Sequence, residues 1–329
     1  MPNQKFKVEI GGRELIVEIS DLAEQSHGSC LVHYGDTTCL VTAVRSSYEK
    51  EEIGFFPLTV DYEERYYAAG KIRGSRYIKR EARPSDEAIC NARLIDRAIR
   101  PLFPENLSRE VQVVVTILSW DGQNEPDVLG LIASSISLLI SDIPWQGPVA
   151  AVRIGQIGDQ FILNPTYEER EKSKMDLVLA ATEREEIFIN MIEGNLEETE
   201  EELILKAFQW AKPYLKKLID FQKEILEKTG KEKIVLPPPV VDLELERELK
   251  KFLENRLEEA LYQKVKGERM DKLNQLKEEI ISFLEENYPE KINYGLKFFD
   301  KEITRVLHEN IIKYEKRPDG RKLDKMREI

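Results

Sequence analysis

A basic segment that leads into an arginine-rich helix is the part of this 329-residue sequence best suited to hold a charged ligand. Residues 65 to 100 contain ten Lys/Arg against four Asp/Glu, although the whole chain carries a net charge of -12. An acidic protein that gathers its positive charge in one segment is suited to bind a polyanion there. The ten cations are Arg65, Lys71, Arg73, Arg76, Lys79, Arg80, Arg83, Arg93, Arg97 and Arg100.

The second half of this segment predicts a helix from about residue 85 to residue 100. Ser85 is a suitable N-cap, and Pro101 ends the helical pattern. One face is apolar, and Arg93, Arg97 and Arg100 form a stripe roughly on the opposite face. These arginines could hold phosphate groups, or they could form salt bridges with nearby acids such as Asp96.

The first 232 residues predict one mixed α+β domain with about ten strands and three helices. Alternating apolar residues in 6–10 and 15–19 flank a Gly-Gly turn and favour a hairpin. Further strands are expected around residues 29–33, 38–44, 55–61, 111–119, 149–154, 160–163, 175–182 and 187–193. The other two expected helices are 127–141 and 200–228, with Pro213 inside the second.

Beyond residue 232 the pattern changes. A proline run at 237–239 predicts a stiff linker over residues 233–241. Residues 242–314 show only helical periodicity, and breaks are expected near Gly267, Pro289 and Gly295. Residues 315–329, which contain Arg317-Pro-Asp-Gly-Arg321, are expected to open a further domain that is missing from this chain.

Composition indicates a cytoplasmic protein with no membrane segment. The N-terminus has no apolar stretch typical of a signal peptide, and the longest mostly apolar run, 128–140, is shorter than the ~20 residues that a membrane span needs. Cys30, Cys39 and Cys90 are scattered and form no metal-binding pattern with the three histidines, so we expect three reduced core thiols and no metal site.

Several long motifs carry a family resemblance. They are Phe-Phe-Pro-Leu-Thr-Val-Asp-Tyr-Glu-Glu-Arg at 55–65, Ala-Ala-Gly-Lys-Ile at 68–72, Gly-Ser at 74–75, Arg-Pro-Ser at 83–85, Ala-Arg-Leu-Ile-Asp-Arg at 92–97, Ile-Arg-Pro-Leu-Phe-Pro at 99–104 and Asn-Pro-Thr at 164–166. With them the chain resembles the N-terminal portion of bacterial polynucleotide phosphorylase. The resemblance implies an α+β, ribonuclease-PH-like (ribosomal protein S5 domain 2-like) lobe over residues 1–232, followed by a small all-α helical domain over residues 242–314.

The resemblance also implies an activity for the complete protein. In this family inorganic phosphate attacks the 3′-terminal phosphodiester of single-stranded RNA and releases a nucleoside diphosphate, and the reaction is reversible. Mg²⁺ assists the reaction in the full-length enzyme. Three subunits form a homotrimeric ring with a central pore for RNA, and the ring can join an RNA-degradation assembly.

The resemblance assigns RNA-binding residues to the basic segment. Tyr77, Lys79 and Arg80 lie where the family has an aromatic and arginine-rich pore loop, although this chain has Ile78 for the second aromatic. An aromatic ring can stack on a base, and cations can follow the phosphate backbone without reading its sequence. Arg83 and the stripe of Arg93, Arg97 and Arg100 are further expected RNA contacts.

The same comparison predicts that this lobe is catalytically silent. At the turn that cradles phosphate in the family's active lobe, this chain has Glu125, Pro126 and Asp127, which repel an anion and remove an N–H donor. The positions of the active lobe's metal-site Asp, Asp and Lys correspond here to Arg170, Asp176 and Val178. We therefore expect no catalytic residue and no complete Mg²⁺ site in this fragment.

Two function classes follow. The first is a truncated polynucleotide phosphorylase whose RNA-binding, ring-forming half needs residues beyond Ile329 for catalysis. The alternative is a stand-alone, non-catalytic RNA-binding or assembly module. The Pro-Asp-Gly-Arg segment near the end favours truncation. An active ribonuclease PH homologue conflicts with Glu125, Asp127, Arg170 and Val178.

Overall fold

The computed structural model describes residues 4–49, 56–74, 83–237 and 241–326. The chain divides into two compact units, Met1–Pro237 and Pro238–Ile329. We call the first unit the lobe and the second the helical unit. In the described ranges, no helix combines the length and the apolar character that crossing a membrane requires.

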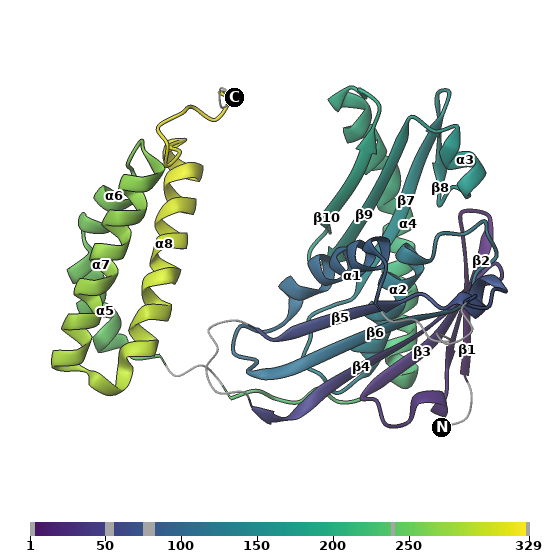
Figure 1. Cartoon of the computed structure of the whole chain (residues 1–329), viewed down its shortest axis with the longest axis horizontal. Helices are drawn as coiled ribbons and strands as arrows, with labels where there is room; N and C mark the ends of the chain where they lie inside the picture. The colour runs from purple at the N-terminus through teal and green to yellow at the C-terminus, as the bar shows by residue number, and fades with distance from the viewer. Residues whose placement is uncertain (1–3, 50–55, 75–82, 238–240, 327–329) are drawn as a thin grey trace. The chain divides into compact units, whose positions relative to one another are not determined.

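Two sheets form the frame of the lobe (Figure 1). The six-stranded sheet has the order β1-β2-β3-β4-β6-β5, and only the β5–β6 pair is parallel. Its strands are β1 (Gln4–Ile10), β2 (Arg13–Ile19), β3 (Gly28–Tyr34), β4 (Thr37–Glu49), β5 (Leu58–Glu63) and β6 (Arg109–Ser119). The four-stranded antiparallel sheet has the order β10-β9-β7-β8, from β7 (Val149–Ile157), β8 (Gln160–Leu163), β9 (Met175–Glu183) and β10 (Ile187–Leu196).

One helix fills the space between the sheets. All residues of α2 (Pro126–Ile140) after Pro126 are buried, and the helix packs on β3 and β4 of one sheet and on β7 of the other. Such a helix must be largely apolar on every side, and the run from Val128 to Ile140 is apolar except for three serines. Two more helices cover the layers: α1 (Asp86–Ile99) packs on β5 and α2, and α4 (Glu201–Thr229) packs on β7 and β9.

A closed ring of hydrogen bonds joins three of these elements inside the core. The Ser135 hydroxyl of α2 donates to Oε1 of Gln222 in α4 at 2.6 Å and accepts from the backbone N–H of Val149 at 2.9 Å. The Gln222 amide donates to the carbonyl of Val149 at 2.9 Å. Each polar side-chain atom in the ring has a partner, so the burial of Ser135 and Gln222 is tolerated.

Two expectations for the lobe need correction. The short helix α3 (Tyr167–Glu171) was not expected, although Thr166 and Glu169 form a capping box that could have revealed it. Cys90 is exposed on α1 and is not a core thiol, because it lies on the face of the helix that points away from α2 and β5. Cys30 and Cys39 are buried as expected, and burial raises the pKa of the Cys30 thiol to about 12.

The segment after α4 is attached to the lobe. The Lys231 amide donates to the carbonyl of Ile140, and the Ile234 amide donates to that of Asp142. Lys233 donates through Nζ to the carbonyls of Leu138 and Ser141 at 2.7 and 2.8 Å, at the end of α2, where the last carbonyls lack partners within the helix. The Leu138 carbonyl also accepts from the Ser141 hydroxyl at 2.7 Å. The first part of the expected linker therefore runs along the lobe as far as Pro237, whose carbonyl accepts from Asn106.

Within its described residues, 241–326, the helical unit has four α-helices: α5 (Leu243–Leu253), α6 (Arg256–Leu261), α7 (Lys266–Asn287) and α8 (Ile292–Tyr314). Their apolar faces form a separate core around Leu249, Ile280 and Leu284. The expected break at Gly295 is wrong, because α8 continues through it. A Cβ at Gly295 would lie 2.4 Å from Cδ1 of Leu284, so this glycine allows α7 and α8 to pack closely.

The close contact of β3 with α2 generates a prediction. A Cβ on Gly28 would lie 2.1 Å from the carbonyl oxygen of Ser137, which is backbone and cannot move aside. Gly28→Ala is expected to lower the free energy of unfolding by at least ~1–3 kcal/mol, measured by urea denaturation. Gly74→Ala is the control, since no atom of the described residues lies within 4 Å of its Cβ position. Equal stability of the two variants would contradict this packing.

A pH dependence is expected from Lys233. Burial lowers the pKa of its ammonium to about 8, against the opposing attraction of Asp142. A lysine in the unfolded chain keeps its proton to higher pH, so between about pH 8 and pH 10 the unfolded state binds more protons. The free energy of unfolding should therefore gain a rising contribution over this window, and Lys233→Met should lack it. Identical pH profiles for the two proteins would show that Lys233 is not buried in this way.

Candidate functional site

The turn that corresponds to the phosphate-binding turn of the family's active lobe lies at the N-terminus of α2. The turn is fixed by Asp121, whose carboxylate accepts from the backbone N–H groups of Gln123 and Asn124, both at 2.8 Å. Although partial burial disfavours the Asp121 carboxylate, these donors hold its pKa below its ordinary value. Glu125 takes the N-cap position and Pro126 begins the helix.

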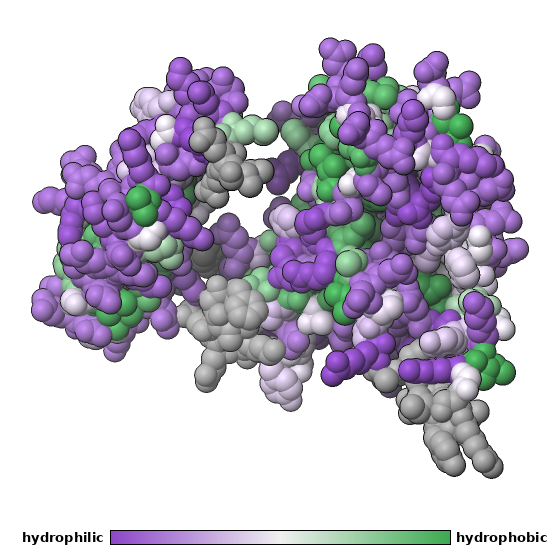
Figure 2. Space-filling view, turned by 45° about the horizontal axis from the view of Figure 1, so that its top comes forward, coloured by the Kyte–Doolittle hydropathy of each residue, from purple (hydrophilic) through white to green (hydrophobic). Residues whose placement is uncertain are grey.

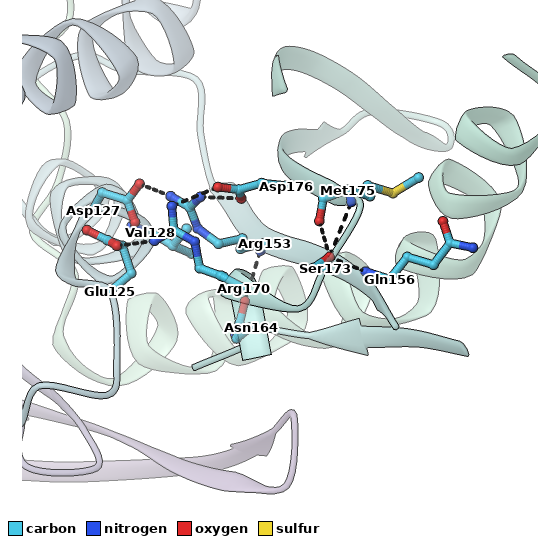
Figure 3. Close-up of polar contacts among 10 residues, drawn as sticks. All are labelled: Glu125, Asp127, Val128, Arg153, Gln156, Asn164, Arg170, Ser173, Met175 and Asp176. Carbon is cyan, nitrogen blue, oxygen red and sulfur yellow. Dashed lines mark hydrogen bonds and ion pairs between the residues drawn. The ribbon is translucent and has the colours of Figure 1, made fainter. Parts of the chain in front are cut away.

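Two arginines bind three carboxylates at this helix end (Figure 3). Arg153 of β7 contacts Asp127 through Nη2 and Asp176 of β9 through Nη1. Arg170 of α3 contacts Glu125 through Nη1 and Asp176 through Nη2, the latter at 2.7 Å. We call these five residues the ion network, since Asp176 links the two arginines into one chain of contacts.

The innermost pair of the ion network is almost completely removed from water. The side chains of Arg153 and Asp127 are 9% and 3% exposed. Burial works against the charge of Arg153, yet the carboxylates of Asp127, Asp176 and Glu125 outweigh it and raise the pKa of the guanidinium above its ordinary value. Burial and the nearby Asp127 raise the pKa of the Glu125 carboxyl, although both arginines oppose this shift.

The ion network decides what this helix end can bind. A free helix N-terminus attracts phosphate through its N–H groups and positive dipole. Here Glu125 and Asp127 stand at that position, and the guanidinium groups that might have held an anion are engaged with three carboxylates. An approaching phosphate would meet one more negative charge than positive charge. The arrangement thus fits a structural role and does not fit phosphate binding.

The three carboxylates of the ion network are also a poor fit for a divalent cation. Mg²⁺ prefers oxygen ligands that are free to coordinate it, and each carboxylate of the ion network already accepts from a guanidinium. Val178, at the third position inferred from the resemblance, is buried in β9. Across the described ranges, no cluster of three or more His, Cys, Asp or Glu side chains is arranged to hold a metal ion.

A cleft of about 1250 Å³ opens beside the ion network. Trp120 and Tyr66 on its wall are partly exposed. The Trp120 ring meets Tyr167 edge to face, with 5.8 Å between centroids. Arg83, an expected RNA contact, is exposed and lines the same cleft. The cleft therefore offers aromatic surface beside an exposed cation of the basic segment, Arg83.

The arginine stripe on α1 is present, but its three members differ in what they contact. Arg100 donates to Asp96 at 2.6 Å and to the carbonyls of Phe56 and Leu58 at 3.0 and 3.1 Å. Arg97 pairs with Glu193 of β10. Arg93 has a single 3.0 Å contact with Asp96, and its side chain is 75% exposed. The stripe thus ranges from a structural arginine at position 100 to a largely solvent-exposed one at position 93.

The other expected RNA-binding residues, Tyr77, Lys79 and Arg80, lie outside the described residues. Sequence reasoning also missed a member of the ion network, Arg153. Its signal was a single charged residue inside the apolar run Val149-Ala-Ala-Val-Arg-Ile154. A charge in a strand that is otherwise buried must have a partner, and the partners are Asp127 and Asp176.

The burial of the Arg153–Asp127 pair makes it sensitive to loss of either partner. Arg153→Met should lower the free energy of unfolding by about 3–5 kcal/mol, because Asp127 is left charged and unpaired. Arg170→Met is the matched control. Its partners are about a quarter exposed to water, so a loss of about 1 kcal/mol or less is expected. Both are measured by urea denaturation.

Adding Asp127→Asn to Arg153→Met tests the cause of that loss. If the unpaired carboxylate is responsible, the double variant should be more stable than Arg153→Met alone. A double variant that is as unstable as the sum of the two single changes would refute the assignment of the loss to charge.

Three family models match the chain. "3′ exoribonuclease family, domain 1" matches residues 11–144, and "domain 2" of the same family matches 147–213. "Polyribonucleotide nucleotidyltransferase, RNA binding domain" matches residues 244–322, in the helical unit.

Known proteins agree with these matches. A polyribonucleotide nucleotidyltransferase of Syntrophomonas wolfei is 41% identical over 326 residues, which cover 99% of this chain and 46% of the relative. One of Alkaliphilus oremlandii is 44% identical over 328 residues, covering 98% of this chain and 46% of the relative. The chain thus spans about half the length of these relatives.

A solved structure shares the fold of the lobe. A chain of the Archaeoglobus fulgidus exosome, solved with RNA bound to the active site, superposes with a TM-score of 0.51 and 15% identity, covering 63% of this chain and 87% of its own length. The expected α+β, ribonuclease-PH-like fold is thereby confirmed. The chain belongs to the 3′ exoribonuclease family, whose two domains it carries in tandem, and matches a portion of the polyribonucleotide nucleotidyltransferases over nearly its whole length.

Proposed function

We propose that this chain is the RNA-holding, ring-forming N-terminal part of a polynucleotide phosphorylase. The complete protein degrades RNA from its 3′ end: inorganic phosphate attacks the terminal phosphodiester, and a nucleoside diphosphate leaves. The same chemistry run backwards extends RNA from nucleoside diphosphates. The match to polyribonucleotide nucleotidyltransferases over 98–99% of this chain supports the proposal.

The lobe itself contributes no chemistry to this reaction in our proposal. The single observation that carries this part is the ion network. Arg153 and Arg170 neutralise Glu125, Asp127 and Asp176 in the place where an active lobe needs room for phosphate. Making room for phosphate at the N-terminus of α2 would require breaking the buried Arg153–Asp127 ion pair, which costs several kcal/mol. Phosphorolysis is therefore assigned to the part of the complete protein that this chain does not contain.

Mg²⁺ belongs to the complete enzyme in this proposal, and the residues of the lobe do not fit it. The three carboxylates of the ion network serve as acceptors for two guanidinium groups. A cation entering among them would meet the positive charges of both arginines. The lobe therefore offers no place for Mg²⁺ among these carboxylates in our proposal.

RNA binding is assigned to the basic segment and the exposed end of the arginine stripe. Tyr77 supplies a ring for stacking, and Lys79, Arg80 and Arg83 supply charge for the phosphate backbone. Within the stripe, Arg93 is the best placed for RNA because its side chain is largely exposed. Arg100 holds the end of α1 to the start of β5 through the carbonyls of Phe56 and Leu58, so its main effect is on the lobe's own structure.

Assembly as a homotrimer would strengthen this RNA site. Threefold symmetry places three copies of the basic segment around one axis and triples the local charge. Such a ring around a pore suits a strand that is held without sequence readout. We place the complete protein in the cytoplasm, where it can join an RNA-degradation assembly.

Two assays on one preparation test the proposal. Poly(A) is incubated with the protein, Mg²⁺ and phosphate, and nucleoside diphosphate release is measured; poly(A) binding is titrated at ~50 and ~200 mM salt, a range over which phosphate contacts change affinity strongly. We expect salt-sensitive binding and no release. Release of nucleoside diphosphate would refute the silent lobe, and absence of binding would refute the RNA-holding role.

Substitutions in the basic segment should then weaken binding. Removing one phosphate-binding cation reduces the slope of log K against log salt by about 0.7 for a single strand. Lys79→Gln/Arg80→Gln should therefore flatten the slope by roughly 1.4. Lys206→Gln/Lys217→Gln is the control with the same change in net charge, since both lysines lie on the exposed side of α4. Equal slopes for the two double variants would place the RNA elsewhere.

A further inference from the structure

The segment that follows α4 is attached to the lobe by a few hydrogen bonds. Residues 231–237, which we call the strap, form no helix or strand and run along the edge of the lobe (Figure 1). Besides its backbone bonds to the turn after α2, the strap is held by two lysines and by its last carbonyl. Lys231 donates through Nζ to the carbonyl of His27 at 2.6 Å, and Asn106 donates to the carbonyl of Pro237 at 2.8 Å.

Little apolar surface holds the strap. Val235 is 88% exposed, and Ile234 and Leu236 are only half-buried. Segments with few buried apolar contacts open from a folded domain more easily than its core does. Gly230, which ends α4 in an extended conformation, gives the chain a hinge directly before the strap, because glycine has the least restricted backbone.

Polar groups beside the strap oppose its attached position. Oδ1 of Asp142 and Nε of Arg45 are buried, and neither has a hydrogen-bond partner among the described residues. Nη2 of Arg45 lies 3.7 Å from Oδ2 of Asp142, which is too far for a direct hydrogen bond. Attachment also places the Lys233 ammonium in a partly buried position. Detaching the strap returns this ammonium to water, which offsets part of the hydrogen bonding that is lost.

The strap decides how much of the chain between the two units is free. With the strap attached, the five residue steps from Pro237 to Asp242, the N-cap of α5, span at most about 18 Å. With the strap detached, the twelve steps from Gly230 to Asp242 span at most about 43 Å. A longer tether lowers the effective concentration of one unit at the other.

This tether enters the helical unit at one end of its charge distribution. Residues 242–248 and 284–291, the acidic end, contain seven Asp/Glu against two Lys/Arg. Residues 262–273 and 313–322, the basic end, contain nine Lys/Arg against four Asp/Glu. The turn Pro289–Lys291 joins the antiparallel helices α7 and α8 at the acidic end, where α5 also begins. The visible face of the helical unit is mostly hydrophilic (Figure 2). The tether length therefore limits how far the basic end can extend.

From these observations we propose that the strap is a latch that opens reversibly while the lobe stays folded, and that its state sets the reach of the helical unit. When the latch is closed, the chain is fixed to the lobe as far as Pro237. When it is open, the chain leaves the lobe at Gly230. The latch does not depend on the proposed function, since it acts through the attachment of the chain and not through a ligand.

Protonation of Lys233 should bias the latch. The charged and titratable groups around the strap are Asp142, Arg45, His27, Lys231 and Glu232. Burial lowers the pKa of His27, so it is uncharged above pH 7. Burial also lowers the pKa of Lys233 to about 8 in the closed latch, and the ordinary value of 10.5 returns when the latch opens. The closed latch thus binds fewer protons, and the open fraction should fall about tenfold from pH 7 to pH 9.

Cleavage by a glutamate-specific protease measures the open fraction in the full chain. The bond after Glu232 lies in the strap, and cleavage needs a detached, extended segment. The cleavage rate is divided by that of a free peptide of residues 228–242 under the same conditions, and a variant is compared with its own peptide. When opening is fast relative to cleavage, this ratio is the open fraction. We expect a ratio well below one that loses its pH dependence in Lys233→Met.

Two variants separate opening of the latch from unfolding of the lobe. Asn106→Ala removes the anchor of Pro237 and should raise the ratio about fivefold. Arg153→Met, the matched control, destabilises the lobe away from the strap and should change the ratio less than twofold. A ratio of one in the wild-type chain would show that the strap is not attached. A ratio that rises with Arg153→Met as steeply as the unfolded fraction from urea denaturation would show that it opens only with the lobe. Either result overturns the latch.

The reach is measured as a distance distribution between two nitroxide labels by pulsed electron paramagnetic resonance. One label is on the exposed Cys90 and the other on Ser282→Cys in α7, while Cys30 and Cys39 are buried and stay unlabelled. Asn106→Ala/Lys231→Ala/Lys233→Ala should bring the cleavage ratio close to one and extend the distribution to longer distances. An unchanged distribution in this opened variant would overturn the role of the latch in setting the reach.

Discussion

The lobe depends on charge compensation at the buried start of one helix. α2 lies between two sheets, and all of its residues after Pro126 are inaccessible to water. Its first turn nevertheless carries Asp127, a carboxylate that water cannot solvate there. Arg153 supplies the missing compensation from the neighbouring sheet, and Asp176 and Arg170 extend the contact to the surface. The four-stranded sheet, α3 and the start of α2 are thereby tied together at one charged point.

In the function that we propose, this compensation is what allows the lobe to keep its fold without carrying out the chemistry. The buried helix and the sheets around it are needed for any lobe of this shape, so they stay. The helix terminus, which could attract an anion, has been filled with internal anions and their arginine partners. The features left to contact a ligand lie on the surface. They are a cleft with aromatic walls, exposed cations such as Arg83 and Arg93, and a separate helical unit with an uneven charge distribution.

Local patterns predicted most of the lobe, because its strands and helices are amphipathic or wholly apolar in their own sequence. The exceptions were decided by contacts across the fold. The low helix propensity of glycine predicted a helix end at Gly295. In the structure α8 continues, and the absence of a side chain at Gly295 allows Leu284 to pack against it. Glu125, Asp127, Arg170 and Asp176 were identified from family resemblance as residues that spoil a phosphate site. Only the three-dimensional pairing showed that Arg153 joins them, since its partners lie 26 and 23 residues away.

The charge distribution of the helical unit has an effect at distances beyond direct contact. With its positive and negative residues at opposite ends, it has a permanent electric dipole moment even though its total charge is close to zero. In the field of a polyanion such a body experiences a torque as well as a weak net force, so it turns its positive end forward before anything touches. The gain is kinetic: a larger share of encounters begins in a productive orientation, and this share falls as salt screens the field.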